Sequence, residues 1–146
     1  MLRGNAPATI DAKGRLKIPT AFRRSIEELH GSDFYITSVD GAGVRVYPFP
    51  VWLEVEKKMA DLPSFNPAVS RLQDLFSYYG AEASMDKQGR LLIQPHLRAA
   101  ADMVGEVAVL GKANHLEVWN NERFLSRLQA SPLSEEDRRI LAALGL

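Results

Sequence analysis

Apolar and polar residues alternate along several short stretches of this chain, a pattern typical of half-buried strands. β-Branched and aromatic residues reinforce the pattern. The strands that it predicts cover residues 33–37, 44–47, 107–110 and 116–119. Turns at residues 40–43 and 111–114 contain glycine and asparagine or aspartate and join these strands in pairs. We therefore expect one such hairpin in each half of the chain.

Other stretches place apolar residues at helical spacing. A short helix is expected to follow Pro19, because proline suits the first helical turn. Its apolar face would hold Phe22, Ile26 and Leu29. Two longer helices are expected after the first hairpin, separated by a proline-containing segment at residues 63–67. Their apolar stripes are Trp52, Val55, Met59 and Leu62 in the first helix, and Val69, Leu72, Leu75, Phe76 and Tyr79 in the second.

The end of the sequence predicts two more helices. The first covers residues 121–128. Ser134 is placed to cap the second, and Asp137 can complete a capping box with it. The second helix is a short amphipathic tail, which we expect to pack on its own subunit rather than bind a partner. Its apolar residues are Ile140, Leu141 and Leu144.

One phrase occurs twice in the chain. Residues 11–18 and residues 86–93 both read Asp-x-x-Gly-Arg-Leu-x-Ile, at a constant offset of 75 residues. An arginine also stands twelve residues after each aspartate, at Arg23 and Arg98. Agreement in order and spacing over so many positions indicates two repeats of one structural unit.

Each copy of the phrase is expected to form a strand, a tight turn and a second strand, so that each unit reads as hairpin, short helix, hairpin. Asp11 and Asp86 can open the turns, because an aspartate at this place bonds the backbone two residues further on. Gly14 and Gly89 allow the positive φ that such turns require.

Arg15 and Arg90 follow the turn glycines directly and should project from the rim of each turn. Each could pair with an aspartate of its own or of the other copy, as a staple, or contact a ligand. Both roles stay open at this point, and they can coexist because a guanidinium group has five donors.

The doubled phrase, together with Tyr47-Pro48 and the Leu-Glu-Val-Trp of residues 116–119, resembles the bacterial MraZ family, which belongs to the AbrB-like group of DNA-binding folds. The resemblance extends from Arg3 to Phe124. It implies an α+β fold in which two tandem AbrB-like units form one swapped-hairpin, double-psi-like β-barrel with flanking helices. It also implies ring-shaped oligomers that bind repeated sites upstream of the division and cell-wall gene cluster.

Neither four-stranded unit is expected to close a core alone, so the two should interlock into one barrel. The segments that we expect are a first unit with its helix at 1–62, a linker and connecting helix at 63–79, a second unit at 80–130, and a helical tail at 131–146.

Composition excludes several classes of protein. Hydrophobic residues make up 46% of the 146 residues and charged residues 25%, as in ordinary globular proteins. No apolar run is long enough to cross a membrane, and the first residues do not resemble a signal peptide. Cysteine is absent, which excludes disulfides and thiolate chemistry. We expect a cytoplasmic protein that associates with the nucleoid.

Net charge is zero, whereas nucleic-acid binders are usually basic. The distribution of charge changes this picture, because six cations and only one acid, Asp11, lie within residues 1–24. A single basic corner can bind phosphate even on a neutral protein. The six cations are Arg3, Lys13, Arg15, Lys17, Arg23 and Arg24.

Enzymatic interpretations fit poorly. His30, His96 and His115 have no metal-ligand spacing, and we expect no metal, no cofactor and no small-molecule substrate. Asp11 and Asp86 could face each other as a proton-sharing pair of carboxylates. An arginine four residues after each would instead hold both acids ionised. We therefore expect no catalytic residues, and turn formation is the favoured role of both aspartates.

A DNA-binding surface fits better. Lys13, Arg15 and Lys17 are two residues apart and should share one face, which Arg45, Lys87 and Arg90 could extend. Such cations neutralise phosphates, arginine can read guanine edges, and a β-ribbon can enter the major groove. The resemblance assigns Arg15 to DNA most directly, and Arg90 would assist.

The hypothesis is thus a sequence-specific transcriptional regulator that binds repeated sites on double-stranded DNA as a ring of identical subunits. Repetition would raise a weak affinity per subunit by about 10²–10⁴. The alternative is an assembly protein with the same fold, whose arginines only staple subunits together.

Overall fold

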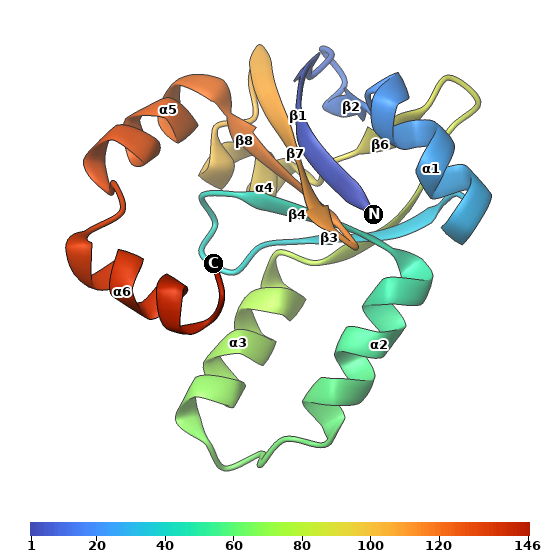
Figure 1. Ribbon diagram of the computed structural model, residues 1–146. Helices are drawn as coiled ribbons and strands as arrows, with labels where there is room; N and C mark the ends of the chain where they lie inside the picture. Colours follow the sequence, from blue (N-terminus) through green and yellow to red (C-terminus); the bar gives the residue numbers. More distant parts are fainter.

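The computed structural model describes all 146 residues and has an α+β architecture, as expected (Figure 1). The strands are β1 (Leu2–Thr9), β2 (Arg15–Lys17), β3 (Asp33–Thr37), β4 (Val44–Pro48), β5 (Ala81–Ser84), β6 (Arg90–Leu92), β7 (Glu106–Ala113) and β8 (Leu116–Asn120). The helices are α1 (Thr20–His30), α2 (Phe49–Ala60), α3 (Pro67–Tyr78), α4 (Pro95–Ala101), α5 (Asn121–Ala130) and α6 (Glu135–Ala143).

Six strands form one antiparallel sheet in the order β1-β7-β8-β4-β3-β5, and β2 pairs with β6 in a separate two-stranded ribbon. The predicted hairpins are confirmed as β3–β4 and β7–β8. The hairpin predicted around each Asp-Gly phrase is wrong, because β1 pairs with β7 and β5 pairs with β3. Only one bridge, between Ile10 and Leu16, joins the two sides of the first turn.

The two repeats therefore interlock. The first strand of each repeat lies on the hairpin of the other repeat, and the ribbon takes one strand from each. This exchange lets strands too short to form a stable sheet alone share one core. The sheet is not closed, since β1 and β5 are its two edges, and the swapped-hairpin barrel stays a prediction.

The main core lies between one face of the sheet and the ribbon with its helices. It contains 19 buried residues. The ribbon and the residue after each of its strands contribute Leu16, Ile18, Leu91 and Ile93. Helix α1 contributes Phe22 and Ile26, as its spacing predicts, whereas Leu29 near the helix end is largely exposed. Every repeat thus supplies one ribbon strand and one helix to the same apolar interior.

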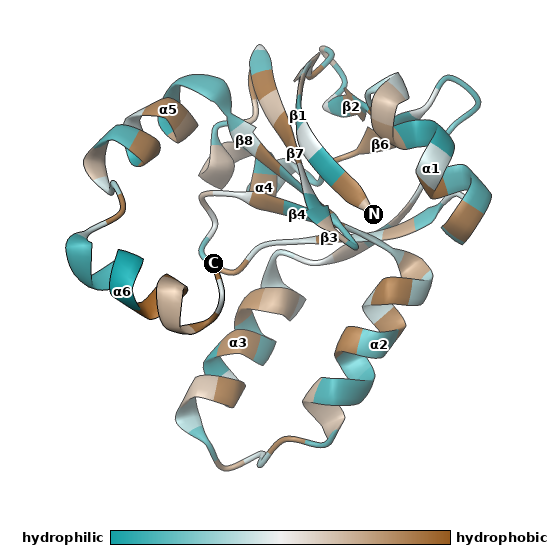
Figure 2. Ribbon diagram, viewed as in Figure 1, coloured by the Kyte–Doolittle hydropathy of each residue, from teal (hydrophilic) through white to brown (hydrophobic).

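Helices α2 and α3 cover part of the other face of the sheet and extend away from it as an antiparallel pair (Figures 1 and 2). Trp52 of α2 stacks on Tyr35 of β3, with ring centroids 4.2 Å apart, and meets the edge of Phe76 of α3. The Tyr35 and Thr37 hydroxyls both donate to the Phe76 carbonyl at 2.9 Å. These contacts hold the helical pair at its base.

The C-terminal helices differ in how they attach. Phe124 of α5 packs against Trp119 of β8, and the Arg127 guanidinium lies 4.7 Å from the centre of the Trp119 ring. The capping box of Ser134 and Asp137 on α6 is confirmed. The expected packing of α6 on its own subunit is not found, because its apolar residues other than Leu141 are exposed.

His115, in the β7–β8 hairpin, is partly buried. Its ring stacks on Tyr47 with centroids 4.6 Å apart. Burial lowers the pKa of His115 to about 4, and the charges of Arg45 and Lys112 add to this effect against the opposing Glu117. The folded protein therefore keeps this imidazole neutral down to acidic pH.

Stability should fall as the pH is lowered from about 6.5 to about 4. In that window the unfolded chain binds a proton at His115 and the folded chain does not. At about 1.4 kcal/mol per pKa unit, the free energy of unfolding would decrease by about 3.5 kcal/mol, and solvent screening of the partly exposed ring reduces the expected loss to about 2 kcal/mol. Urea unfolding at several pH values measures this. His115→Phe keeps a ring on Tyr47 and should lack that part of the pH dependence; an unchanged profile in the variant would contradict the prediction.

Candidate nucleic-acid interface

The first turn is built around the Asp11 carboxylate. Its Oδ1 accepts hydrogen bonds from the backbone N–H groups of Lys13 at 3.0 Å and Arg15 at 2.9 Å, and its Oδ2 accepts from the Arg15 Nε at 2.8 Å. The Gly14 N–H donates to the Asp11 carbonyl, with a φ of +85° that suits glycine. The predicted roles of aspartate and glycine in this turn are therefore what the geometry shows.

The second turn repeats this arrangement. Asp86 accepts from the backbone N–H groups of Gln88 and Arg90, each at 2.9 Å, and from the Arg90 Nε at 2.8 Å. Gly89 has a φ of +76°. The two turns thus have the same geometry although some of their residues differ. The reason is that the hydrogen bonds use the shared aspartate and arginine and backbone N–H groups.

Both aspartates are held ionised. The Arg15 backbone N–H bond is the largest influence on the pKa of Asp11 and lowers it. Desolvation of the carboxylate opposes this, but the Arg15 side-chain bond, the Lys13 backbone bond and the Arg15 charge add to the lowering, so the pKa stays below its ordinary value. The Arg90 backbone and side-chain bonds lower the pKa of Asp86 in the same way. Each carboxylate is engaged within its own turn, so the two do not form the hydrogen-bonded pair that a shared proton requires.

The ribbon places the motif cations on one side. Leu16 lies opposite Leu91, and both side chains are fully buried. Arg15 lies opposite Leu92, and Lys17 lies opposite Arg90. Because alternate residues point to opposite faces and paired residues share a face, these four side chains lie on the face away from the core. The expectation that Arg15, Lys17 and Arg90 point the same way agrees with this register.

Arg15 and Arg90 act as staples and still reach solvent. Each uses its Nε for the aspartate of its own turn, and no hydrogen bond occupies the terminal amino groups of either. Their side chains are 28% and 27% exposed. The geometry therefore leaves donors on both arginines for a second partner, in agreement with roles that coexist.

Three lysines complete the outer surface. Lys13 and Lys87 stand in the two turns and Lys17 at the end of β2, all exposed and without an ion pair within 4 Å. Arg45 does not extend this surface. It alternates with the core residues Val44 and Val46, so it lies on the other face of the sheet, where it donates to the Tyr47 hydroxyl at 3.1 Å.

The basic corner is partly neutralised. Arg23 pairs with Glu27 at 3.0 Å and Arg24 with Glu28 at 3.2 Å, each one helical turn further along α1. Both acids lie just after residues 1–24, the range in which the excess of cations was found. Of the corner's cations without an acid partner, Lys13 and Lys17 lie at the ribbon and its first turn, whereas Arg3 lies on β1.

Two arginines that were assigned no role from the sequence lie close to the turns. Arg98 lies against Gly14, and Arg23 lies against Gly89 and donates from its Nη2 to the Lys87 carbonyl at 3.0 Å. Each stands twelve residues after the aspartate of its own repeat. Their shared spacing marks them as part of the motif.

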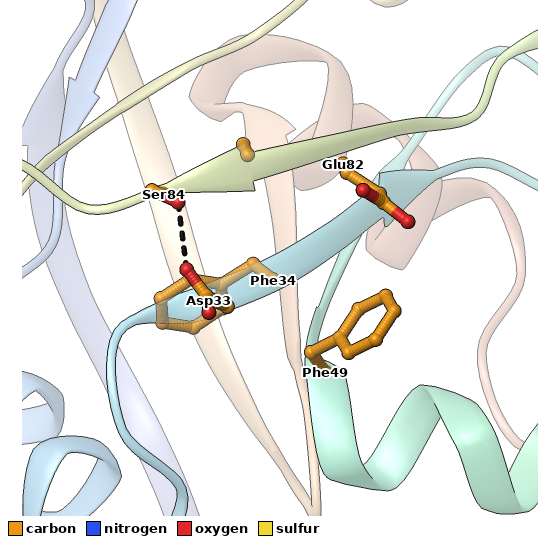
Figure 3. Close-up of a pocket in the computed structure, with 6 residues that line it drawn as sticks. Asp33, Phe34, Phe49, Glu82 and Ser84 are labelled. Carbon is orange, nitrogen blue, oxygen red and sulfur yellow. Dashed lines mark hydrogen bonds between the residues drawn. The ribbon is translucent and has the colours of Figure 1, made fainter.

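No competing chemical site stands out. A hollow of about 400 Å³ lies between β3, β5 and the start of α2. Its lining residues are drawn in Figure 3, and among them the Ser84 hydroxyl donates to the Asp33 carboxylate at 2.6 Å. Glu82 and Phe49 also line it (Figure 3), and it contains neither a histidine nor a basic residue. The structure contains no group of three potential metal ligands, and none of its helices has both the length and the hydropathy of a membrane span.

Comparisons with known proteins agree on one family. Residues 80–143 match the family model described as "MraZ protein, putative antitoxin-like". Relatives named transcriptional regulator MraZ include one from Acidobacterium capsulatum, which is 44% identical over the whole of both chains, and one from Koribacter versatilis, also 44% identical over both full lengths. A relative of the same name from Nitrosospira multiformis is 34% identical over 90% of this chain and 89% of its own.

The matched lengths of the first two relatives cover both repeats. The identities of 34–44% over nine-tenths or more of this chain show the family. The chain belongs to the MraZ family.

Proposed function

We propose that this protein is a sequence-specific DNA-binding transcriptional regulator and that the β2–β6 ribbon with its two turns is the DNA-binding surface. The observation that carries the proposal is the ribbon register, which buries Leu16 and Leu91 and turns Arg15, Lys17 and Arg90 outward together. The relatives' printed name supports regulation of transcription as the role.

The five cations have separable tasks. Lys13, Lys17 and Lys87 are flexible point charges on the outer surface and neutralise phosphates. Arg15 is fixed through its Nε by Asp11 and presents its two amino groups, which suits reading of a guanine edge in the major groove. Arg90 is held in the same way in the second turn and assists.

One subunit offers few cations, so binding requires repetition. We propose that the protein assembles as a ring of identical subunits and engages repeated sites upstream of its own division and cell-wall gene cluster. Several weak contacts made together raise affinity by about 10²–10⁴ over a single contact. Such a regulator acts in the cytoplasm, at the nucleoid, and needs no cofactor or catalytic group.

Salt titration tests this proposal. The affinity of the protein for a duplex carrying its own upstream region should fall linearly on a log–log plot against salt, with a slope of about −3 per engaged subunit when the three lysines meet phosphates. Fluorescence anisotropy measures this, with a shuffled duplex of equal length as the control. Flat or absent binding would instead favour the alternative function, an assembly protein whose arginines only staple its surfaces.

A further inference from the structure

We infer that Arg98 and Arg23 are positioning residues that clamp the DNA-binding turns reciprocally, each holding the turn of the repeat to which it does not belong. Arg98 follows the second phrase and lies against Gly14 in the first turn. Arg23 follows the first phrase and lies against Gly89 in the second turn. The inference rests on the proposed function of the turns.

Arg98 can pack against the first turn because Gly14 has no side chain. A Cβ atom added at Gly14 would overlap the Nη1 and Cζ atoms of Arg98, so the guanidinium occupies the space that any other residue would fill. The Nε of Arg98 is buried and has no hydrogen-bond partner, and no acid lies within ion-pair distance of the group. Arg98 therefore serves packing against this turn rather than an ion pair.

The second turn has a looser clamp. A Cβ atom at Gly89 would lie 3.0 Å from the Cδ, Nε and Nη1 atoms of Arg23. The Arg23 Nη2 donates to the Lys87 carbonyl at 3.0 Å, and its Nε donates to Glu27 at 3.0 Å. Arg23 thus reaches across to the second turn while an acid of its own helix fixes its direction.

The backbone makes the same exchange. The Ile18 N–H donates to the Gly89 carbonyl at 2.8 Å, and the Ile93 N–H donates to the Gly14 carbonyl at 3.1 Å. Each turn glycine is therefore held twice by the opposite repeat, once through its carbonyl and once by an arginine side chain. Arg15 and Arg90 directly follow these glycines in the sequence. The direction in which the two arginine side chains point therefore depends on the opposite repeat.

Hydrogen exchange tests the clamp without DNA. In the full-length protein, Arg98→Ala should raise the exchange rate of amides 13–15 in the first turn by about tenfold or more and leave amides 88–90 unchanged, whereas Arg23→Ala should do the reverse. Arg24→Ala, on the same helix and paired only with Glu28, is the control and should change neither turn. Equal acceleration in both turns, or acceleration only in the variant's own repeat, would overturn the inference.

Two further measurements keep the inference decidable. Should Arg98→Ala prevent folding, Arg98→Lys and Arg98→Gln replace it. Arg98→Lys keeps length and charge and should retain most of the protection of amides 13–15, whereas the shorter Arg98→Gln should lose it; wild-type protection in Arg98→Gln would overturn the clamp. Arg98→Ala should also weaken binding to the upstream duplex about tenfold. Loosened turns with unchanged DNA affinity would overturn the positioning role, whereas absent DNA binding by the wild type would refute the proposed function and leave the exchange result standing.

Discussion

Arg15→Ala is expected to lower the affinity for the upstream duplex by at least about 100-fold while the protein keeps its fold and its oligomeric size. One lost arginine contact to a base costs about 1–3 kcal/mol, and the loss recurs in every subunit that engages DNA. Arg15 is the one motif cation that is fixed at its Nε and flanked by free lysines on both sides in the sequence. Fluorescence anisotropy and gel filtration measure affinity and size.

Two variants sharpen this expectation. Arg24→Ala removes an exposed arginine of α1 that pairs with Glu28, and it should leave binding almost unchanged. Arg15→Lys keeps the charge but lacks the planar fork, so it should preserve the salt dependence and lose discrimination between the upstream and shuffled duplexes. Dissociation of the oligomer in Arg15→Ala, with DNA affinity intact, would contradict the assignment and support the stapling alternative.

Leu91→Ala is expected to destabilise the protein by about 2–5 kcal/mol, because it removes a fully buried side chain at the centre of the ribbon. Leu91 lies opposite Leu16, and this pair is where the two repeats meet under the cationic surface. The loss should therefore also release the ribbon and weaken DNA binding. Urea unfolding of wild type and variant gives the difference in the free energy of unfolding.

Leu92→Ala is the matched control, one residue further on the same strand. Its side chain is 53% exposed and points to the opposite face, so removing it should cost about 0.5 kcal/mol or less. Equal losses in the two variants would show that the ribbon does not bury Leu91 and would contradict the register from which the DNA-binding surface is argued.

The chemistry of the turns could be predicted from the sequence because it is local. Asp11 bonds residues two and four positions ahead, and Gly14 lies inside the same loop. The capping box of Ser134 and Asp137 is equally local, and so are the two hairpins with their short turns. Each of these features depends on side chains and backbone groups only a few residues apart.

Contacts between segments that are distant in the sequence were predicted less well from the pattern of apolar and polar residues. The repeated phrase predicted a strand before each turn but paired it with the strand after that turn, whereas β1 pairs with β7. Several strands of similar length and polarity compete as partners, so the phrase alone does not identify the right one. Arg45 was expected on the cationic surface and lies on the other face, because burial of Val44 and Val46 decides the orientation of β4. The tail helix α6 was expected to be covered and is exposed, which amphipathic spacing alone does not distinguish.

The two copies of one unit, the closure of each turn and the residues that carry the positive charge all follow from the amino-acid sequence. The exchange of strands between the copies, the joining of β2 and β6 in one ribbon and the reach of Arg23 and Arg98 to the opposite turns become visible only in the folded chain. The physical reason is range: hydrogen bonds between near neighbours follow from spacing, whereas the partners of a strand are chosen by the joint burial of apolar faces from the whole chain.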